Sequence, residues 1–340
     1  FKSLKNLLAR KLPIELNKKI VKDQFFSSLI FFKDIKLRTE ILFNRVLKEN
    51  FSGATAIYTN FINDDIELIR KAKEMGLEII HEVIITPNSG LIMIEEYNLF
   101  PNIESNDDTI EKVKKGMDLD LIKWKLSDKI LVPSRMVLEN VMKLGVNPKK
   151  VFLVPYGINE DWFKYKSTPI RGRILFVGLV GLRKGVHYLA EAGRILSNKG
   201  YDYEIVVVGK KLVDTNIDLF KGPQYIGHIP RSEIIKEYLS ADLFVLPTIA
   251  ESFGLVHLEA MACGVPVITT ENCGSVVDDN KDGLIIPIRD PIAIADAIIK
   301  IVENRDLRDK MSKAAKLKAS QYTWGQYKKR LVEVLDYEDT

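Results

Sequence analysis

From residue 54 onward, short apolar runs alternate with longer segments whose apolar residues recur at helical spacing. The runs are rich in Val, Ile and Leu, which is typical of parallel strands buried on both faces. Ser134 is expected to cap the start of one helix and Gly145 its end. In the first half, the predicted strands are 54–60, 77–85, 128–133 and 151–155, and the predicted helices are 64–76, 111–126 and 134–145.

The second half repeats this alternation more regularly. Its predicted strands are 173–178, 203–209, 224–228, 242–247, 265–270 and 283–288, and its predicted helices are 184–199, 231–240, 253–263 and 290–304. Strands that alternate with helices of this length indicate βαβ units with a parallel sheet. We therefore expect two Rossmann-like, doubly wound α/β domains that face each other across a cleft at the carboxyl ends of their strands.

The pattern also gives the expected boundaries. Residues 1–156 would form the first domain, 157–172 a linker without periodicity, 173–322 the second domain, and 323–340 a helix that crosses back to the first domain. Residues 1–50 are predicted to be mainly helical, with no clear opening strand. The chain begins with Phe rather than Met, so either an atypical or a truncated start is expected.

Composition excludes several classes of protein. With 46% hydrophobic residues, 28% charged residues and a net charge of +4, the chain resembles an ordinary globular protein, and no nucleic-acid partner is expected. Two cysteines suit a reducing cytoplasm. No transmembrane run or signal peptide is found. Residues 1–22 form a basic amphipathic stretch, which predicts either a helix packed on its own domain or peripheral contact with the inner membrane surface.

The stretch ESFGLVHLE places two glutamates, Glu251 and Glu259, eight positions apart. The first follows a predicted strand in a loop, and the second lies more than a turn inside the next helix, so they should reach different parts of one ligand. Between them, the backbone N–H groups of Phe253, Gly254 and Leu255 are expected to form an anion site at the helix start.

A second loop, VGLVGLRKG, brings Arg183 and Lys184 to the end of a predicted strand, next to Gly181. The loop lacks the G-x-G-x-x-G fingerprint of dinucleotide-binding proteins. Two cations at this position suit a diphosphate, and with the two glutamates they indicate an extended ligand with hydroxyl groups at both ends. A nucleotide sugar has this chemistry.

These motifs resemble those of the family 4 (group 1) glycosyltransferases, which are retaining enzymes of the GT-B architecture. The resemblance rests on the E-x7-E pair, the Arg183-Lys184-Gly185 turn, and the runs GHIPRSEIIKEYLSADLFVLPT and EAMACGVPVITT. It extends back through DKILVPS and VPYGIN, and covers about residues 54–320.

The resemblance implies roles for individual residues. Glu251 would bind hydroxyls of the donor hexose and Glu259 those of the ribose. Arg183 and Lys184 would hold the diphosphate and stabilise it as it leaves. His81, at a predicted strand end, would lie beside the reacting sugar. The remaining implied donor contacts are Gly181, His228, Ile229, Ser252, Phe253, Gly254 and Leu255.

The implied activity is transfer of a hexose, with retention and without a metal or other cofactor, from a nucleoside diphosphate sugar to a hydroxyl of a glycan or lipid-linked glycan. Glu95 and Glu96 are candidates for lining the acceptor pocket. The D-x-D sequence at 118–120 lies in a predicted helix, where a solvated surface is expected rather than a metal site.

Two features depart from the family pattern. Leu179 stands where the family has an Arg, and the usual amino-terminal strand with its Gly-Gly loop is not visible. Two other functions therefore stay open. One is a nucleotide-sugar epimerase, and the other is a GT-B protein that binds a nucleotide sugar without catalysis or serves as partner subunit of an active transferase.

Overall fold

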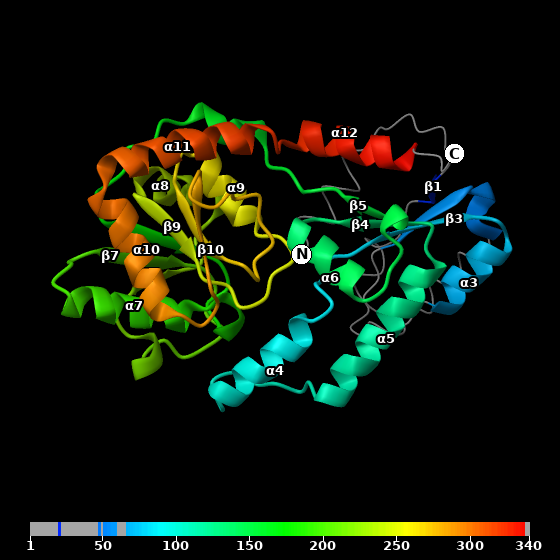
Figure 1. The fold of residues 1–340 in the computed structure, drawn as a ribbon, viewed down its shortest axis with the longest axis horizontal. Helices are drawn as coiled ribbons and strands as arrows, with labels where there is room; N and C mark the ends of the chain where they lie inside the picture. The colour runs from blue at the N-terminus through cyan, green and yellow to red at the C-terminus, as the bar shows by residue number, and fades with distance from the viewer. Residues whose placement is uncertain (1–19, 22–46, 49, 60–65, 337–340) are drawn as a thin grey trace.

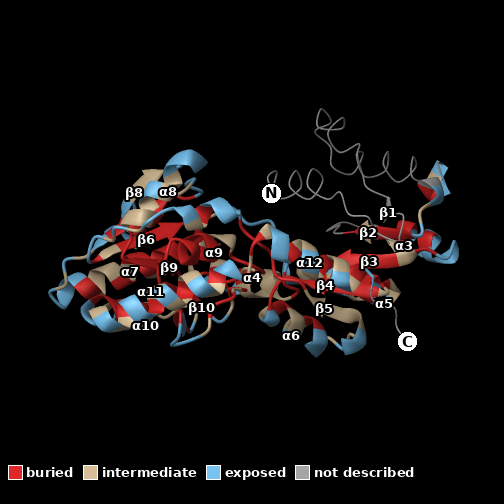
Figure 2. Cartoon of the chain, turned by 90° about the horizontal axis from the view of Figure 1, so that it is seen from above, coloured by how far each residue is buried: buried red, intermediate tan, exposed pale blue. Residues whose placement is uncertain are grey.

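The structure is a computed structural model, and it describes residues 20–21, 47–48, 50–59 and 66–336. The described chain forms two lobes, each built on its own parallel sheet, which lie side by side in Figure 1. We call the lobe with strands β1–β5 the first domain and the lobe with β6–β11 the second domain. Figure 2 shows that buried residues are concentrated in the strands of both.

The first domain has the strand order β1-β2-β3-β4-β5. Ile79, Ile80, Ile130 and Leu131 of the central strands are buried, as the apolar runs predict. The strands are β1 (Ile20–Val21), β2 (Ala56–Thr59), β3 (Glu78–Glu82), β4 (Lys129–Val132) and β5 (Val151–Leu153), and the helices are η2 (Asn50–Gly53), α3 (Ile66–Glu74), α4 (Ser89–Leu99), α5 (Ile110–Leu126), α6 (Arg135–Lys143) and η3 (Pro148–Lys150).

Two helix ends can be compared with the prediction. Ser134 caps α6 as expected, because its side chain accepts a hydrogen bond from the N–H of Val137 at 3.3 Å. At the other end the cap residue is Leu144, and Gly145 follows it with φ of 81°. The helix therefore ends one residue earlier than predicted, and Gly145 lies just beyond the cap in the left-handed conformation that often follows a helix end.

A short strand that the sequence pattern did not predict lies at Ile20–Val21. These residues form β1, which pairs in parallel with Ala56 and Ile57 at the edge of the first sheet. Both residues are β-branched, which suits a strand. The predictions for residues 1–19 and 22–46 lie outside the described residues.

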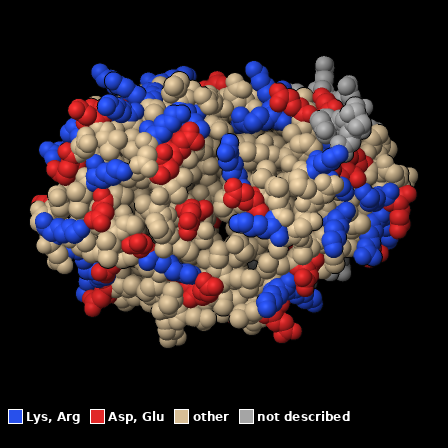
Figure 3. Space-filling model, viewed as in Figure 1, with Lys and Arg blue, Asp and Glu red and all other residues tan. Residues whose placement is uncertain are grey.

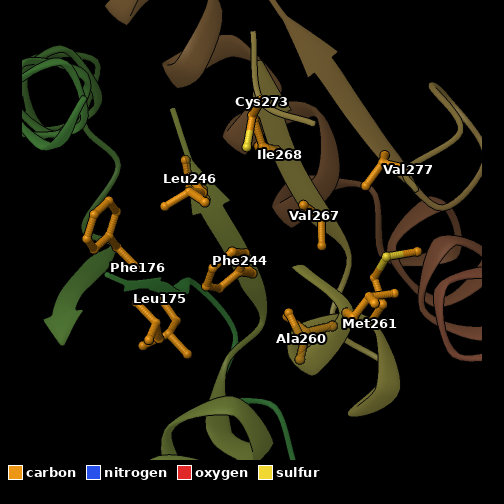
Figure 4. Packing of buried hydrophobic residues seen from close by; sticks show 14 of the residues in the cluster. Leu175, Phe176, Phe244, Leu246, Ala260, Met261, Val267, Ile268, Cys273 and Val277 are labelled. Carbon is orange, nitrogen blue, oxygen red and sulfur yellow. The ribbon is translucent and has the colours of Figure 1, made fainter. Parts of the chain in front are cut away.

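The second domain has the strand order β11-β10-β9-β6-β7-β8. Figure 4 shows Phe244 of β9 and Val267 of β10 in one cluster with Ala260 and Met261 of α9. The strands are β6 (Arg173–Val177), β7 (Glu204–Val208), β8 (Gln224–Gly227), β9 (Leu243–Leu246), β10 (Val267–Thr270) and β11 (Gly283–Ile286), and the helices are η4 (Glu160–Lys164), η5 (Leu182–Lys184), α7 (Val186–Asn198), η6 (Asp218–Phe220), α8 (Arg231–Ser240), α9 (Leu255–Ala262), α10 (Pro291–Glu303), α11 (Arg305–Ser320) and α12 (Trp324–Leu335).

Helices α12 and α4 both contribute contacts between the two domains. Helix α12 lies against the first domain, where Arg330 donates to the carbonyl oxygen of Pro155 at 2.9 Å and Lys129 donates to that of Leu335 at 3.1 Å. Helix α4 reaches the second domain from the opposite side in Figure 1. The sequence pattern did not predict α4, because its apolar residues do not fall on one face of a helix.

Candidate active site

The predicted pair of cations converges on one carboxylate oxygen. Arg183 donates from Nη1 to Oε2 of Glu251 at 2.8 Å, and Lys184 donates from Nζ to the same oxygen. Arg183 and Lys184 lie in η5, after β6, and Glu251 follows the neighbouring strand β9. Burial raises the pKa of Glu251, but Lys184 and Arg183 lower it by more, so that it lies below its ordinary value. Glu251 is therefore ionised, and a positive loop faces it.

The loop that carries Glu251 is fixed by backbone hydrogen bonds to residues 272–274. Glu251 donates to the carbonyl oxygen of Asn272 at 3.1 Å and accepts from the N–H of Gly274 at 2.8 Å. The N–H of Gly254 donates to the carbonyl oxygen of Gly274 at 2.9 Å, so the expectation that it is free to bind an anion is wrong. Helix α9 then begins at Leu255 without a side-chain cap. Its positive end lies at this edge of the sheet.

Glu259 has a different environment inside α9. Tyr238 donates to its Oε2 at 3.0 Å, and Arg231, at the start of α8, donates to its Oε1 at 3.1 Å. Burial raises the pKa of Glu259, and Arg231 and Tyr238 offset only part of that rise. The sequence pattern pointed to neither partner, because no local pattern links α8 with α9.

The other predicted donor contacts lie at or next to the same edge. His228 and Ile229 follow β8, and His228 is exposed. The side chains of Ser252 and Phe253 are buried. Gly181 lies beside Glu104 of the first domain, whose Oε1 accepts from the N–H of Leu182 at 2.7 Å.

His81 lies near the carboxyl end of β3 and is buried, with no hydrogen-bond partner at Nδ1. Burial, and to a smaller degree Lys123, lower the pKa of His81 to about 3. Its imidazole is therefore neutral at physiological pH. The next residue, Glu82, accepts from the hydroxyls of Tyr58 and Tyr156, each at 2.8 Å. This buried carboxylate was not foreseen, because its two partners are far away in the sequence.

The expectation that Glu96 lines an acceptor pocket is wrong. Its side chain is fully buried in the contact between α4 and the second domain, where it pairs with Nε2 of His187 at 2.8 Å and Nε of Arg289 at 2.7 Å. Glu95 is exposed and pairs with the same arginine at 3.1 Å. Both glutamates thus join the domains, through His187 at the start of α7 and Arg289 just before α10.

One face of the molecule is mixed in charge. Figure 3 shows a hollow between the two lobes bordered by acidic and basic side chains, which are interspersed over this face. The D-x-D sequence at 118–120 lies in α5, as predicted. Within the described ranges, no group of three or more His, Cys, Asp and Glu residues is arranged to hold a metal ion, and no helix is long and apolar enough to span a membrane.

Comparison with known proteins gives matches over much of this chain. Residues 159–318 match the family model for glycosyl transferases group 1. A D-inositol 3-phosphate glycosyltransferase from Corynebacterium urealyticum is 31% identical over 49% of this chain and 44% of its own length. The capsular polysaccharide biosynthesis glycosyltransferase CapM from Staphylococcus aureus is 34% identical over 39% of this chain and 37% of its own. These matches span less than half of each relative.

Solved structures match over a longer range. Sucrose-phosphate synthase from Thermosynechococcus elongatus has a TM-score of 0.67 at 20% identity, covering 89% of this chain and 78% of its own. Anabaena HepE in complex with UDP has a TM-score of 0.67 at 15% identity, and the match covers 87% of this chain and 82% of the HepE chain. At such identities the likeness concerns the fold. The chain thus has the GT-B architecture, and its residues 159–318 match the family model for glycosyl transferases group 1.

Proposed function

We propose that the protein is a retaining glycosyltransferase that moves a hexose from a nucleoside diphosphate sugar to a hydroxyl acceptor. The observation that carries the proposal is the meeting of Arg183 and Lys184 on one oxygen of Glu251, at neighbouring strand ends of the second domain. A diphosphate bound there would take over the two cations. Glu251 would then be free to accept hydrogen bonds from hexose hydroxyls.

The proposed chemical step uses this arrangement. The bond between the anomeric carbon and the phosphate oxygen breaks, and its electron pair passes to the phosphate, whose charge Arg183 and Lys184 stabilise. The acceptor oxygen bonds to the anomeric carbon from the same face, and its proton passes to the departing phosphate oxygen. Charge neutralisation by two side chains supports a reaction without a metal ion.

Glu259 and His81 have supporting parts in this proposal. Glu259, held by Tyr238, would accept from the ribose hydroxyls. His81 is neutral because of its low pKa, so it would offer the sugar a hydrogen bond and no charge. The acceptor is a hydroxyl compound, which fits the inositol phosphate and polysaccharide activities in the names of the relatives. Glycan and lipid-linked acceptors are both included, and residues 1–22 would supply any contact with the inner membrane surface.

The first test is calorimetric binding of UDP, GDP and ADP to the wild type and to Glu259→Gln, with and without EDTA. UDP is a reasonable first probe because the HepE structure contains it. We expect one nucleotide to bind more tightly than the other two, and to do so without a metal ion. Glu259→Gln should lower the affinity for that nucleotide about tenfold, since a charged hydrogen bond to ribose is lost. Absence of binding by all three nucleotides would overturn the proposal.

Turnover separates the enzyme from the two other functions. Glu251→Ala should lower kcat for sugar transfer at least about 100-fold, because it removes a group that holds the donor in the transition state. The anomeric configuration of the product, read by NMR, should match that of the donor. Conversion of the donor without an acceptor would favour an epimerase, and binding without any turnover would favour a non-catalytic protein.

A further inference from the structure

A loop of the second domain that carries Glu251 is in direct contact with the first domain. The hydroxyl of Ser134, at the start of α6, donates to the carbonyl oxygen of Ser252 at 2.9 Å, and both side chains are buried. A Cβ atom at Gly274 would lie 2.5 Å from the same hydroxyl, so three backbone segments meet here without spare room. The position of Ser252 therefore depends on the first domain.

The neighbouring residue strengthens this contact. Phe253 packs edge-on against Tyr156 of the first domain, with ring centroids 5.4 Å apart. Tyr156 is itself held by its hydrogen bond to Glu82. An oriented aromatic pair contributes beyond the area it buries.

The cation-bearing loop is also held from the first domain. The carboxylate of Glu104 accepts from the N–H of Leu182 at 2.7 Å, one residue before Arg183. A Cβ atom at Gly181 would overlap that carboxylate, so the glycine permits the close approach. This hydrogen bond fixes the start of η5, where both cations lie.

We propose that Ser134 and Glu104 are positioning residues for the donor site. They belong to the first domain, yet they hold the two second-domain loops that present Glu251 and the two cations. The inference rests on the proposed function, since it concerns the same nucleotide-sugar site. Without these contacts the loops would have to be ordered when the nucleotide binds, which lowers affinity.

The experiment compares two pairs of variants. Ser134→Ala removes both the contact with Ser252 and the N-cap of α6, and Thr109→Ala is its control, because it removes the N-cap of α5 at an exposed site of the same domain. Glu104→Ala is matched by Asp107→Ala, which removes the same charge from an exposed position of the same segment.

Two measurements are made on the full chain. Calorimetry with UDP, GDP and ADP gives nucleotide affinity, and amide hydrogen exchange of the unliganded protein reports on residues 249–256 and 180–186. Ser134→Ala and Glu104→Ala should each weaken binding about three- to tenfold, the effect of one hydrogen bond, and should each speed exchange in the loop they contact. Glu104→Gln keeps an acceptor oxygen and should behave like the wild type.

The outcomes separate this inference from the proposed function. If the wild type binds a nucleotide but Ser134→Ala and Glu104→Ala match their controls in affinity and exchange, the positioning role is wrong and the proposed function stands. If the wild type binds none of the three nucleotides, the proposed function fails and this inference fails with it. Faster amide exchange in the two loops with unchanged nucleotide affinity would also overturn the inference, because the contacts would then order the loops without affecting nucleotide binding.

Discussion

At the scale of single residues, Glu251 and Glu259 have the same side chain but opposite pKa shifts. Lys184 and Arg183 lower the pKa of Glu251 by more than burial raises it, whereas burial keeps that of Glu259 above its ordinary value. The difference arises because two cations meet one oxygen of Glu251, while Glu259 receives a single, largely exposed Arg231 and a neutral hydroxyl.

This contrast predicts opposite effects on stability. Glu251 stabilises the fold above its unfolded pKa, and this contribution is lost as pH falls through its lower folded pKa. Glu251→Gln should therefore cost about 1–2 kcal/mol at pH 7, with a smaller cost in acid. Glu259 has a raised folded pKa, so its ionisation costs stability as pH rises from its unfolded towards its folded pKa. Glu259→Gln should be more stable than the wild type at pH 7 and lose this advantage in acid.

Urea unfolding of the three proteins between pH 4 and pH 8 measures both effects. Each variant serves as the control for the other, because both replace a carboxylate by an amide in the same site. Parallel pH profiles for the two variants would contradict the assigned environments.

At the scale of elements, the turn from η5 into α7 decides where the cations point. Gly185 ends η5 and begins α7 with φ of 67°, a conformation that glycine adopts without strain. A Cβ atom there would overlap the carbonyl oxygen of Pro247, in the loop that leads to Glu251. The Arg-Lys-Gly sequence thus needs its glycine for close packing of the two loops.

Gly185→Ala should destabilise the protein by at least about 2 kcal/mol, because it adds both a steric overlap and an unfavourable φ. Gly200→Ala is the matched control, since Gly200 has φ of 85° and a Cβ atom added there would have no neighbouring atom within 4 Å. That variant should cost about 1 kcal/mol, the backbone effect alone. Equal thermal unfolding midpoints for the two variants would show that the loops do not pack as described.

At the scale of the whole molecule, α4 joins the domains through charges that are partly withdrawn from water. Arg289 of the second domain contacts Glu95, Glu96 and the carbonyl oxygen of Ile92. His187 meets Glu96 from the start of α7, and Phe100 packs against the His187 ring with centroids 4.6 Å apart. The contact lies just beyond the cation-bearing loop, so the two domains meet beside the candidate site.

Arg289→Ala should therefore lower the free energy of unfolding by about 2–4 kcal/mol, because it leaves the buried carboxylate of Glu96 with fewer partners. Arg171→Ala, which breaks a half-exposed pair with Glu303, is the control and should cost at most about 1 kcal/mol. Urea unfolding compares the two. Similar losses would mean that the contact between α4 and the second domain adds little to stability.

Much of the fold was predictable from the sequence. The strands from residue 54 onward and most helices follow from apolar runs, amphipathic segments and caps such as Ser134, which are local features. Strand β1 was not predicted because it is an edge strand of only two residues, which pair with β2. Helix α4 escaped it because both of its sides meet protein, which removes the one-sided pattern of a surface helix.

The sequence by itself determined where Glu251, Arg183 and Lys184 lie, since each follows a buried strand and parallel strands bring their carboxyl ends to one edge. Only the tertiary structure decided which charges pair. Glu96 and Arg289 lie 193 residues apart, and no periodicity connects them. Side-chain partners across a domain contact depend on how the surfaces of two folded domains meet, and short-range sequence patterns carry no information about the geometry of that contact.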